Sequence, residues 1–222
     1  MQKRKLNYRF HNPNSMAATA DYILKILTLG DTSVGKTSII LRYTKTPFPK
    51  KALSTIGVDF RSRIVTIENK KRAKVLLWDT AGQERFRNVA SNYYNGTDCV
   101  LLVFDITNPN SFTILDYWVQ QLEQKKRMDD ICMILVGNKA DIKSKQTVQQ
   151  NDINKYIAKL GIKYFEVSAL NNEGIDELFN YAIQETIKLI VKRENDLSAT
   201  NRISHLTPDE NEVKEKKGFK CC

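Results

Sequence analysis

The 222-residue sequence predicts an α/β fold with a doubly wound, six-stranded, mostly parallel sheet, one antiparallel edge strand and helices on both faces. Three observations favour this class. Short apolar segments alternate with longer segments of helical period. The run Cys99–Phe104 is continuously apolar, as expected for a parallel strand covered on both sides. A glycine-rich loop at residues 30–35 separates the first expected strand from the first expected helix.

The first half of the domain contains a buried strand, a helix, a proline-containing loop and a hairpin. Their expected bounds are Tyr22–Leu29 for the strand, Thr37–Tyr43 for the helix, 46–57 for the loop, and Phe60–Ile67 and Ala73–Trp78 for the hairpin strands. Residues 69–71 make the hairpin turn, and residues 79–86 leave the sheet as a loop. Along the first hairpin strand, one face carries Phe60, Ser62, Ile64 and Thr66.

The second half alternates strands and helices. The expected strands are Cys99–Phe104, Ile131–Val136 and Lys163–Val167, and the expected helices are Ser111–Arg127, about Asn151–Leu160, and one from about Gly174 to Arg193. In the last helix the apolar residues recur at i, i+3, i+4, so one face packs on the sheet. Residues 21–193 therefore form one domain. Cys99 and Cys132 lie inside apolar strands and are expected to be buried thiols.

Both ends of the chain differ from the domain in composition. Residues 1–20 carry four basic and no acidic residues and are expected to form a disordered basic arm. They lack the apolar core of a signal peptide, although a mitochondrial transit peptide and a start at Met16 both stay open. Residues 194–222 are expected to be a flexible tail ending in Cys221 and Cys222. The net charge is +10, but no basic stripe is interleaved with aromatic residues, which argues against nucleic-acid binding.

Residues 30–37 fit the phosphate-binding pattern G-x-x-x-x-G-K-S/T. Gly30 and Gly35 let the loop wrap tightly, so that its backbone N–H groups converge on phosphate oxygens. Lys36 neutralises the β- and γ-phosphates, and the Thr37 hydroxyl is placed to ligate Mg²⁺. The dipole of the following helix also favours an anion here.

The choice of base is indicated by Asn138, Lys139 and Asp141, which follow an expected strand. The Asp141 carboxylate can accept hydrogen bonds from N1–H and the 2-amino group of guanine, and adenine offers neither donor. Lys139 can lay its stem along the base, and Asn138 can tie this loop to the phosphate loop.

Together these segments resemble the five guanine-nucleotide motifs of the Ras superfamily. The motifs are the phosphate loop, Thr55, Asp79–Gln83, Asn138–Asp141 and Ser168–Leu170. Within that superfamily the sequence is most similar to the Rab family, on the evidence of Ile56–Phe60, Trp78–Phe86, Tyr93–Gly96 and the final Cys221-Cys222. The resemblance implies a P-loop G domain over residues 21–193, with switch loops at about 46–60 and 79–95.

The resemblance also implies residue roles. Thr37 and Thr55 ligate Mg²⁺ directly, and Asp79 does so through water. The N–H groups of Thr55 and Gly82 contact the γ-phosphate, and Gln83 orients the attacking water as the catalytic residue. The implied nucleotide-binding set is Asp31, Thr32, Ser33, Val34, Gly35, Lys36, Thr37, Ser38, Phe48, Thr55, Gly82, Asn138, Lys139, Asp141, Ser168, Ala169 and Leu170. In that set Phe48 packs on the guanine edge and the Ala169 N–H meets guanine O6, whereas Ile56, Phe60, Trp78 and Tyr93 face effectors.

For a Rab-like chain, Cys221 and Cys222 are geranylgeranylated, and two lipid chains make a stable anchor where one is marginal. The implied location is the cytosolic face of internal membranes, in exchange with the cytosol. The implied partners are a guanine-nucleotide exchange factor, a GTPase-activating protein, a GDP-dissociation inhibitor or escort protein, and trafficking effectors. Hydrolysis of GTP to GDP is expected to be slow alone, because no arginine of the chain is obviously placed to stabilise the transition state.

The sequence departs from the family pattern at two places. Thr32 and Ser33 stand where Ras-like loops often carry two glycines, which bears on the intrinsic hydrolysis rate. Asn95 and Thr97 replace the more usual Arg and Ala of the Rab pattern, so effector identity does not follow from the resemblance.

Two other functional classes remain as alternatives. One is a GTP-bound interaction module with negligible hydrolysis, against which Gln83 argues. The other is a phosphate-loop kinase of small metabolites. It would need an acceptor site and a lid, neither of which is visible in the sequence.

Overall fold

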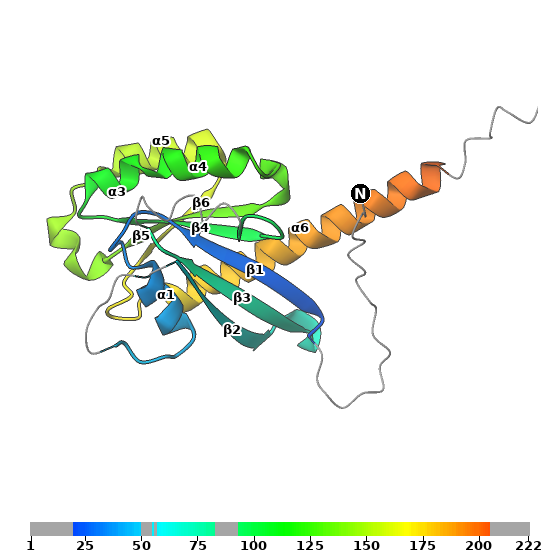
Figure 1. The fold of residues 1–222 in the computed structure, drawn as a ribbon, viewed down its shortest axis with the longest axis horizontal. Coiled ribbons are helices and arrows are strands. Elements are labelled where there is room, and N and C mark those ends of the chain that lie inside the picture. The colour runs from blue at the N-terminus through cyan, green and yellow to red at the C-terminus, as the bar shows by residue number, and fades with distance from the viewer. Residues whose placement is uncertain (1–19, 50–54, 56, 83–92, 205–222) are drawn as a thin grey trace, which may run out of the picture.

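The computed structural model describes residues 20–49, 55, 57–82 and 93–204, with side chains described up to residue 196. Its centre is a six-stranded sheet in the order β2-β3-β1-β4-β5-β6 (Figure 1). The strands are β1 Tyr22–Leu29, β2 Val58–Thr66, β3 Arg72–Thr80, β4 Cys99–Asp105, β5 Cys132–Asn138 and β6 Lys163–Val167. Only β2 runs antiparallel to its neighbour, so the predicted sheet is confirmed.

Helices cover both faces of this sheet, as the sequence predicts (Figure 1). One face carries α1 Lys36–Tyr43 and α6 Ile175–Ser204. The other carries α3 Pro109–Thr113, α4 Leu115–Glu123 and α5 Gln150–Leu160. Three short 3₁₀ turns complete the described elements, at Glu68–Lys70, Met128–Asp130 and Ala140–Lys145. Within the described part of the chain, no helix combines the length and apolar character needed to cross a membrane.

The alternation of side chains along β2 matches the hairpin prediction. Phe60, Ser62, Ile64 and Thr66 are the exposed residues of one face. The opposite face packs against α1 and α6 through half-buried residues such as Val65. Because no described helix covers the outer face of β2, its large apolar side chains Phe60 and Ile64 remain about half exposed.

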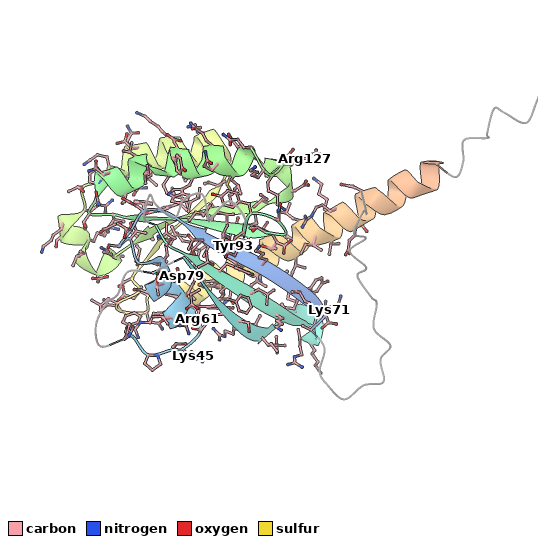
Figure 2. All side chains as sticks on the ribbon, viewed as in Figure 1. Lys45, Arg61, Lys71, Asp79, Tyr93 and Arg127 are labelled. Atoms are coloured by element: carbon pink, nitrogen blue, oxygen red, sulfur yellow. The ribbon has the colours of Figure 1, made fainter. Side chains whose placement is uncertain are left out.

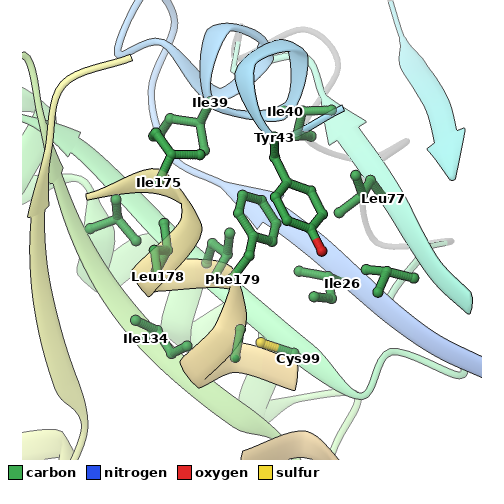
Figure 3. Packing of buried hydrophobic residues seen from close by; sticks show 14 of the residues in the cluster. Ile26, Ile39, Ile40, Tyr43, Leu77, Cys99, Ile134, Ile175, Leu178 and Phe179 are labelled. Carbon is green, nitrogen blue, oxygen red and sulfur yellow. The ribbon is translucent and has the colours of Figure 1, made fainter. Parts of the chain in front are cut away.

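The core between the sheet, α1 and α6 contains residues that are far apart in the chain (Figure 3). Tyr43 from α1 stacks on Phe179 from α6, with ring centroids 3.7 Å apart. Cys99 and Cys132 are register partners on β4 and β5, and both are buried free thiols, as expected. The stacking of Tyr43 on Phe179 ties α1, which begins at the phosphate loop, to the C-terminal helix.

Two of the predicted helices differ from the observed ones by more than one residue at an end. The segment expected as one helix over Ser111–Arg127 begins at Pro109, is interrupted at Ile114 and ends at Glu123. The start is earlier because the Asn108 side chain accepts a hydrogen bond from the Asn110 N–H (3.1 Å), and proline is well suited to a first helical position.

The last helix is longer than predicted. It continues from Arg193 to Ser204, so the predicted end of the helix is eleven residues too early, and the flexibility expected of the tail stays a prediction. The apolar period ends near Arg193, but the chain holds no glycine or proline between Gly174 and Pro208 that would break the helix. Figure 1 shows this part of α6 extending beyond the sheet. Residues 1–19 and 205–222 lie outside the described chain, so the predictions for them remain untested.

Candidate nucleotide-binding site

The candidate site lies at the edge of the sheet where the parallel strands end. There β1, β3, β5 and β6 release the loops that carry the sequence motifs. The carboxyl ends of parallel strands are the common ligand-binding edge of such sheets. The topology therefore brings together loops that start at residues 30, 81, 139 and 168.

The phosphate loop is closed by its own lysine. Lys36 donates hydrogen bonds to the carbonyl oxygens of Gly30 (2.9 Å) and Asp31 (2.6 Å). Its side chain is buried, and this burial lowers the pKa of Lys36 to about 8, although Asp79 and Asp31 favour the charged form. A buried ammonium that holds only neutral carbonyls is well placed to pair with an anionic ligand.

Two positions of the phosphate loop, Gly35 and Ser33, have left-handed backbone conformations. Gly35 has φ 96°, and a Cβ there would clash with the Asn138 amide. Ser33 adopts φ 60°, a left-handed conformation that costs a serine more than a glycine. Thr32 and Ser33 are exposed, so their extra side chains do not fill the space inside the loop.

Three residues expected to hold Mg²⁺ converge beside α1, where Figure 2 labels Asp79. The Thr37 hydroxyl donates to Asp79 Oδ2 (2.6 Å) and lies 2.9 Å from the Thr55 hydroxyl oxygen. Asp79 is 2% exposed, and its other carboxylate oxygen, Oδ1, has no hydrogen-bond partner in the described structure. Burial raises the pKa of Asp79, opposed by the Thr37 hydrogen bond and by Lys36. An unpartnered buried carboxylate oxygen beside two hydroxyls fits a hard divalent cation such as Mg²⁺.

Gly82 brings the start of the loop after β3 against the phosphate loop. A Cβ at Gly82 would clash with the backbone of Asp31 and Thr32, so the close approach requires glycine. This contact places the start of the expected second switch loop next to the phosphate site. Gln83, which follows it, lies outside the described residues, as does Ile56 of the first switch loop.

Asn138 joins three loops. Its side chain donates to the Val34 carbonyl (2.8 Å) and accepts from the Ala169 N–H (3.1 Å). The first bond is the link expected between the base loop and the phosphate loop. The second uses the N–H that the resemblance assigns to guanine O6, and that assignment remains a prediction.

The Asp141 carboxylate is held by the loop after β6. The Ser168 hydroxyl donates to Asp141 Oδ1 (2.6 Å) and accepts from the Asn171 N–H (3.1 Å). The serine therefore fixes one carboxylate oxygen through a bond that is itself anchored to the backbone. A fixed carboxylate suits recognition of two neighbouring donors on a base edge.

Sequence reasoning missed two residues that shape this site, Asp105 and Arg42. Asp105 ends β4 and forms an ion pair with Lys139 (2.6 Å). Burial opposes its ionisation, but hydrogen bonds from Lys139 and Thr107 outweigh burial, so the pKa of Asp105 is lowered. The pair orients the Lys139 stem that is expected to lie along the base. The one available signal was the position of Asp105 at the end of a central strand.

Arg42, in the last turn of α1, carries no motif that would have revealed its role. It donates to the carbonyl oxygens of Ala169 (2.6 Å) and Leu170 (2.6 Å). Its guanidinium carbon also lies 4.1 Å from the centre of the Phe48 ring. Arg42 thereby connects the ring expected at the guanine edge with the loop expected at guanine O6.

The expected effector-facing aromatic residues form one group, which we call the aromatic cluster: Phe60, Trp78 and Tyr93. The ring centroids of Phe60 and Trp78 are 5.3 Å apart, and those of Trp78 and Tyr93 are 5.1 Å apart. Phe60 is 49% exposed, so the cluster presents apolar surface to solvent. Of the other predicted site residues, Val34 is buried in the core and Ser38 is half-buried on α1, whereas Cys221 and Cys222 lie outside the described chain.

Comparison with known proteins agrees with this geometry. A model of the Ras family matches residues 25–188. The chain is 36% identical over 206 residues to the Ras-related protein Rab-8B of Homo sapiens, covering 93% of this chain and 99% of the relative. It is 38% identical over 209 residues to the Ras-related protein Rab-8A of Gallus gallus, with the same two coverages.

Proposed function

Because the chain belongs to the Rab family of Ras-related small GTPases, enzymes that bind GTP and hydrolyse it to GDP, we propose that it is a membrane-anchored molecular switch in vesicle trafficking. The observation that carries this proposal is the meeting of Thr37, Thr55 and Asp79 beside the phosphate loop. Thr37 belongs to that loop, whereas Thr55 belongs to an expected switch loop. A ligand held there links nucleotide binding to the position of the switch loop.

The chain's own residues account for nucleotide binding. Lys36 exchanges its carbonyl partners for the β- and γ-phosphates, and Asp141 reads the guanine edge. Thr37 and Thr55 would hold Mg²⁺ directly, and Asp79 would hold it through water. When bound, the ion offsets the phosphate charge.

Hydrolysis depends on the placement of one water molecule. Gln83 orients that water for attack on the γ-phosphate, while the N–H groups of Thr55 and Gly82 hold the phosphate in place. The intrinsic rate is low because no motif of the sequence places an arginine at the charge that develops in the transition state, and an activating protein supplies one. Loss of the γ-phosphate removes the anchor of both switch loops, which then relax.

The remaining parts of the cycle involve partners and a membrane. An exchange factor restores GTP, effectors read the aromatic cluster in the GTP state, and a GDP-dissociation inhibitor or escort protein carries the lipidated chain through the cytosol. Geranylgeranyl groups on Cys221 and Cys222 anchor the chain on the cytosolic face of internal membranes. The extended α6 and the residues after it supply the spacing between the domain and the bilayer.

The catalytic part is tested by single-turnover hydrolysis of GTP with Gln83→Leu. We expect the rate to fall roughly tenfold or more while GTP affinity stays near wild type, since Gln83 acts on water and not on binding. Gln120→Leu, an exposed change on α4, is the control. Equal rates in all three proteins would remove Gln83 from its role. A wild-type rate indistinguishable from that of free GTP would favour an interaction module without turnover.

The anchoring part is tested by imaging the full-length chain with an N-terminal tag, beside its Cys221→Ser/Cys222→Ser variant. The wild-type chain should mark discrete internal membranes and the variant should be diffuse. If both mark the same membranes, the paired cysteines are not the anchor.

A further inference from the structure

One lysine of β1 contacts the aromatic cluster, although it belongs to none of the nucleotide motifs. The Lys25 ammonium donates to the carbonyl oxygens of Tyr93 (2.6 Å) and Asn95 (2.8 Å). It also lies 4.6 Å from the centre of the Trp78 ring. Lys25 therefore touches Trp78 through a cation–π contact and Tyr93 through its backbone. Figure 2 labels Tyr93, which belongs to the aromatic cluster, and Asp79, which belongs to the expected metal site.

A second residue binds the same carbonyl group. The Thr97 hydroxyl donates to the Tyr93 carbonyl (3.0 Å), and the Thr97 N–H donates to the Tyr94 carbonyl (3.2 Å). Thr97 is 1% exposed, so its hydroxyl is held inside the turn. This is one of the two positions at which the sequence departs from the usual Rab pattern, with threonine in place of alanine.

The base of the Lys25 side chain is also fixed. Its backbone N–H donates to Asp98 Oδ2 (2.9 Å), and Asp98 Oδ1 pairs with Arg193 of α6 (3.5 Å). Burial lowers the pKa of Lys25, Lys126 lowers it further and Asp98 opposes both. The Lys25 ammonium thus donates to backbone carbonyls and lies near charges of both signs. We call the two residues that donate to the Tyr93 carbonyl, Lys25 and Thr97, the clamp.

We propose that Lys25 and Thr97 are positioning residues for the aromatic cluster. They hold the Tyr93 carbonyl from two sides, so that the Tyr93 ring stays packed on Trp78. The carbonyl oxygen has two lone pairs and accepts one bond from each residue. Because β1 carries Lys25 and ends at the phosphate loop, the same strand connects one of the two positioning residues with the start of the nucleotide site.

Use of the cluster by effectors rests on the proposed function, but the clamp is a property of the chain alone. Its test therefore needs no partner and reads the packing of Trp78 directly. The chain holds two tryptophans, and Trp118 is fully buried, so a neutral quencher such as acrylamide reports mainly on Trp78. A neutral quencher also avoids attraction to the lysine charge.

The experiment measures acrylamide quenching in the GDP-loaded full-length chain. Lys25→Met and Thr97→Val each remove donors to Tyr93 while keeping most of the side-chain volume, and the quenching constant should rise at least about twofold for Lys25→Met. Two matched controls should behave as wild type. Lys74→Met removes an exposed lysine from the same face of the neighbouring strand, and Thr97→Ser keeps the hydroxyl. GDP affinity should stay within about twofold in all four variants, because none contacts the phosphate or base loops.

Several outcomes would overturn the proposal. Unchanged quenching in Lys25→Met would show that Tyr93 needs no clamp. An equal rise in Lys74→Met would assign the effect to net charge, and an equal rise in Thr97→Ser would assign it to packing. A large loss of GDP affinity in Lys25→Met would place the lysine in the nucleotide site. Failure of the proposed function would instead appear as absent hydrolysis or anchoring with the quenching pattern intact.

Discussion

At the scale of single residues, the charge of Lys36 is the feature of the site that depends most on pH. Its ammonium is buried, and the burial lowers its pKa to about 8. It donates hydrogen bonds to two neutral carbonyls of its own loop. Burial of this charge away from water therefore destabilises the folded chain, and a bound phosphate would offset that cost.

We expect GDP binding to become pH-dependent above about pH 8. Phosphates favour charged Lys36, so its pKa is higher in the complex than in the free protein, and binding at pH 8.5 takes up part of a proton. The uptake is measured by calorimetry in buffers of different ionisation enthalpy. Lys36→Arg should remove it and the exposed Lys45→Met should retain it. No proton uptake at pH 8.5 in the wild-type chain would contradict this account.

The same shift affects the stability of the nucleotide-free chain with the opposite dependence. The pKa of Lys36 in the folded chain, about 8, lies below the ordinary lysine value of 10.5. Between those two values the unfolded chain binds more protons than the folded chain. The contribution of Lys36 to the free energy of unfolding therefore rises as the pH rises through this window.

The phosphate-loop and base-loop motifs predicted the position of Thr37 and the link made by Asn138, and the resemblance to the Ras superfamily added Asp79 to the expected metal site. These residues belong to motifs in which a ligand dictates residue type and distance. Arg42 and Asp105 could not be predicted this way. Both form contacts with residues that are distant in the chain. Arg42 and Ala169, for example, are 127 residues apart, and no local pattern encodes such a pair.

At the scale of elements, α6 consists of two parts with different environments. Its first part packs on the sheet through buried residues including Leu178, Phe179 and Ile183. Beyond Arg193 the helix leaves the sheet, and residues 194–196 are exposed. Helical propensity without a breaker maintains this second part, whereas burial of apolar surface stabilises the first.

We therefore expect the two parts to contribute differently to stability. Phe179→Ala removes the ring stacked on Tyr43 and should lower the free energy of unfolding by about 3–5 kcal/mol. Truncation after Arg193 keeps the ion pair between Arg193 and Asp98. It should change the free energy of unfolding by about 1 kcal/mol or less. Urea unfolding measures both, and Leu170→Ala, at a 60% exposed position, is the control. A truncation as damaging as Phe179→Ala would mean that the outer part of α6 is packed.

At the scale of the whole molecule, the site is an assembly of separate loops. The phosphate loop, the Thr55 and Gly82 segments, the base loop and the loop after β6 contact one another only because the sheet aligns their strands. A nucleotide bound across them would hold elements from both halves of the chain. Ligand and metal should therefore stabilise the entire domain.

We expect GDP with Mg²⁺ to raise the melting temperature of the chain. At a ligand concentration of about 100 to 1,000 times Kd the stabilisation is about 2.7–4.1 kcal/mol. For a domain of this size that corresponds to roughly 5–16 °C. Chelation of Mg²⁺ with EDTA should reverse much of the shift. Scanning calorimetry of wild type and Asp79→Asn tests this, since the variant keeps the shape of the side chain but loses the carboxylate beside the two hydroxyls. An EDTA effect of the same size in both proteins would remove Asp79 from the metal site.

The sequence by itself determined the alternation of strands and helices, the phosphate-binding loop and the residues expected to select guanine. These features depend on local period and on fixed spacing, which neighbouring residues in the chain are enough to encode. The tertiary structure alone decided that Asp105 holds Lys139 and that Lys25 and Thr97 share the Tyr93 carbonyl. Each of these two contacts depends on which strand ends and loops meet in space. A one-dimensional pattern does not contain such information.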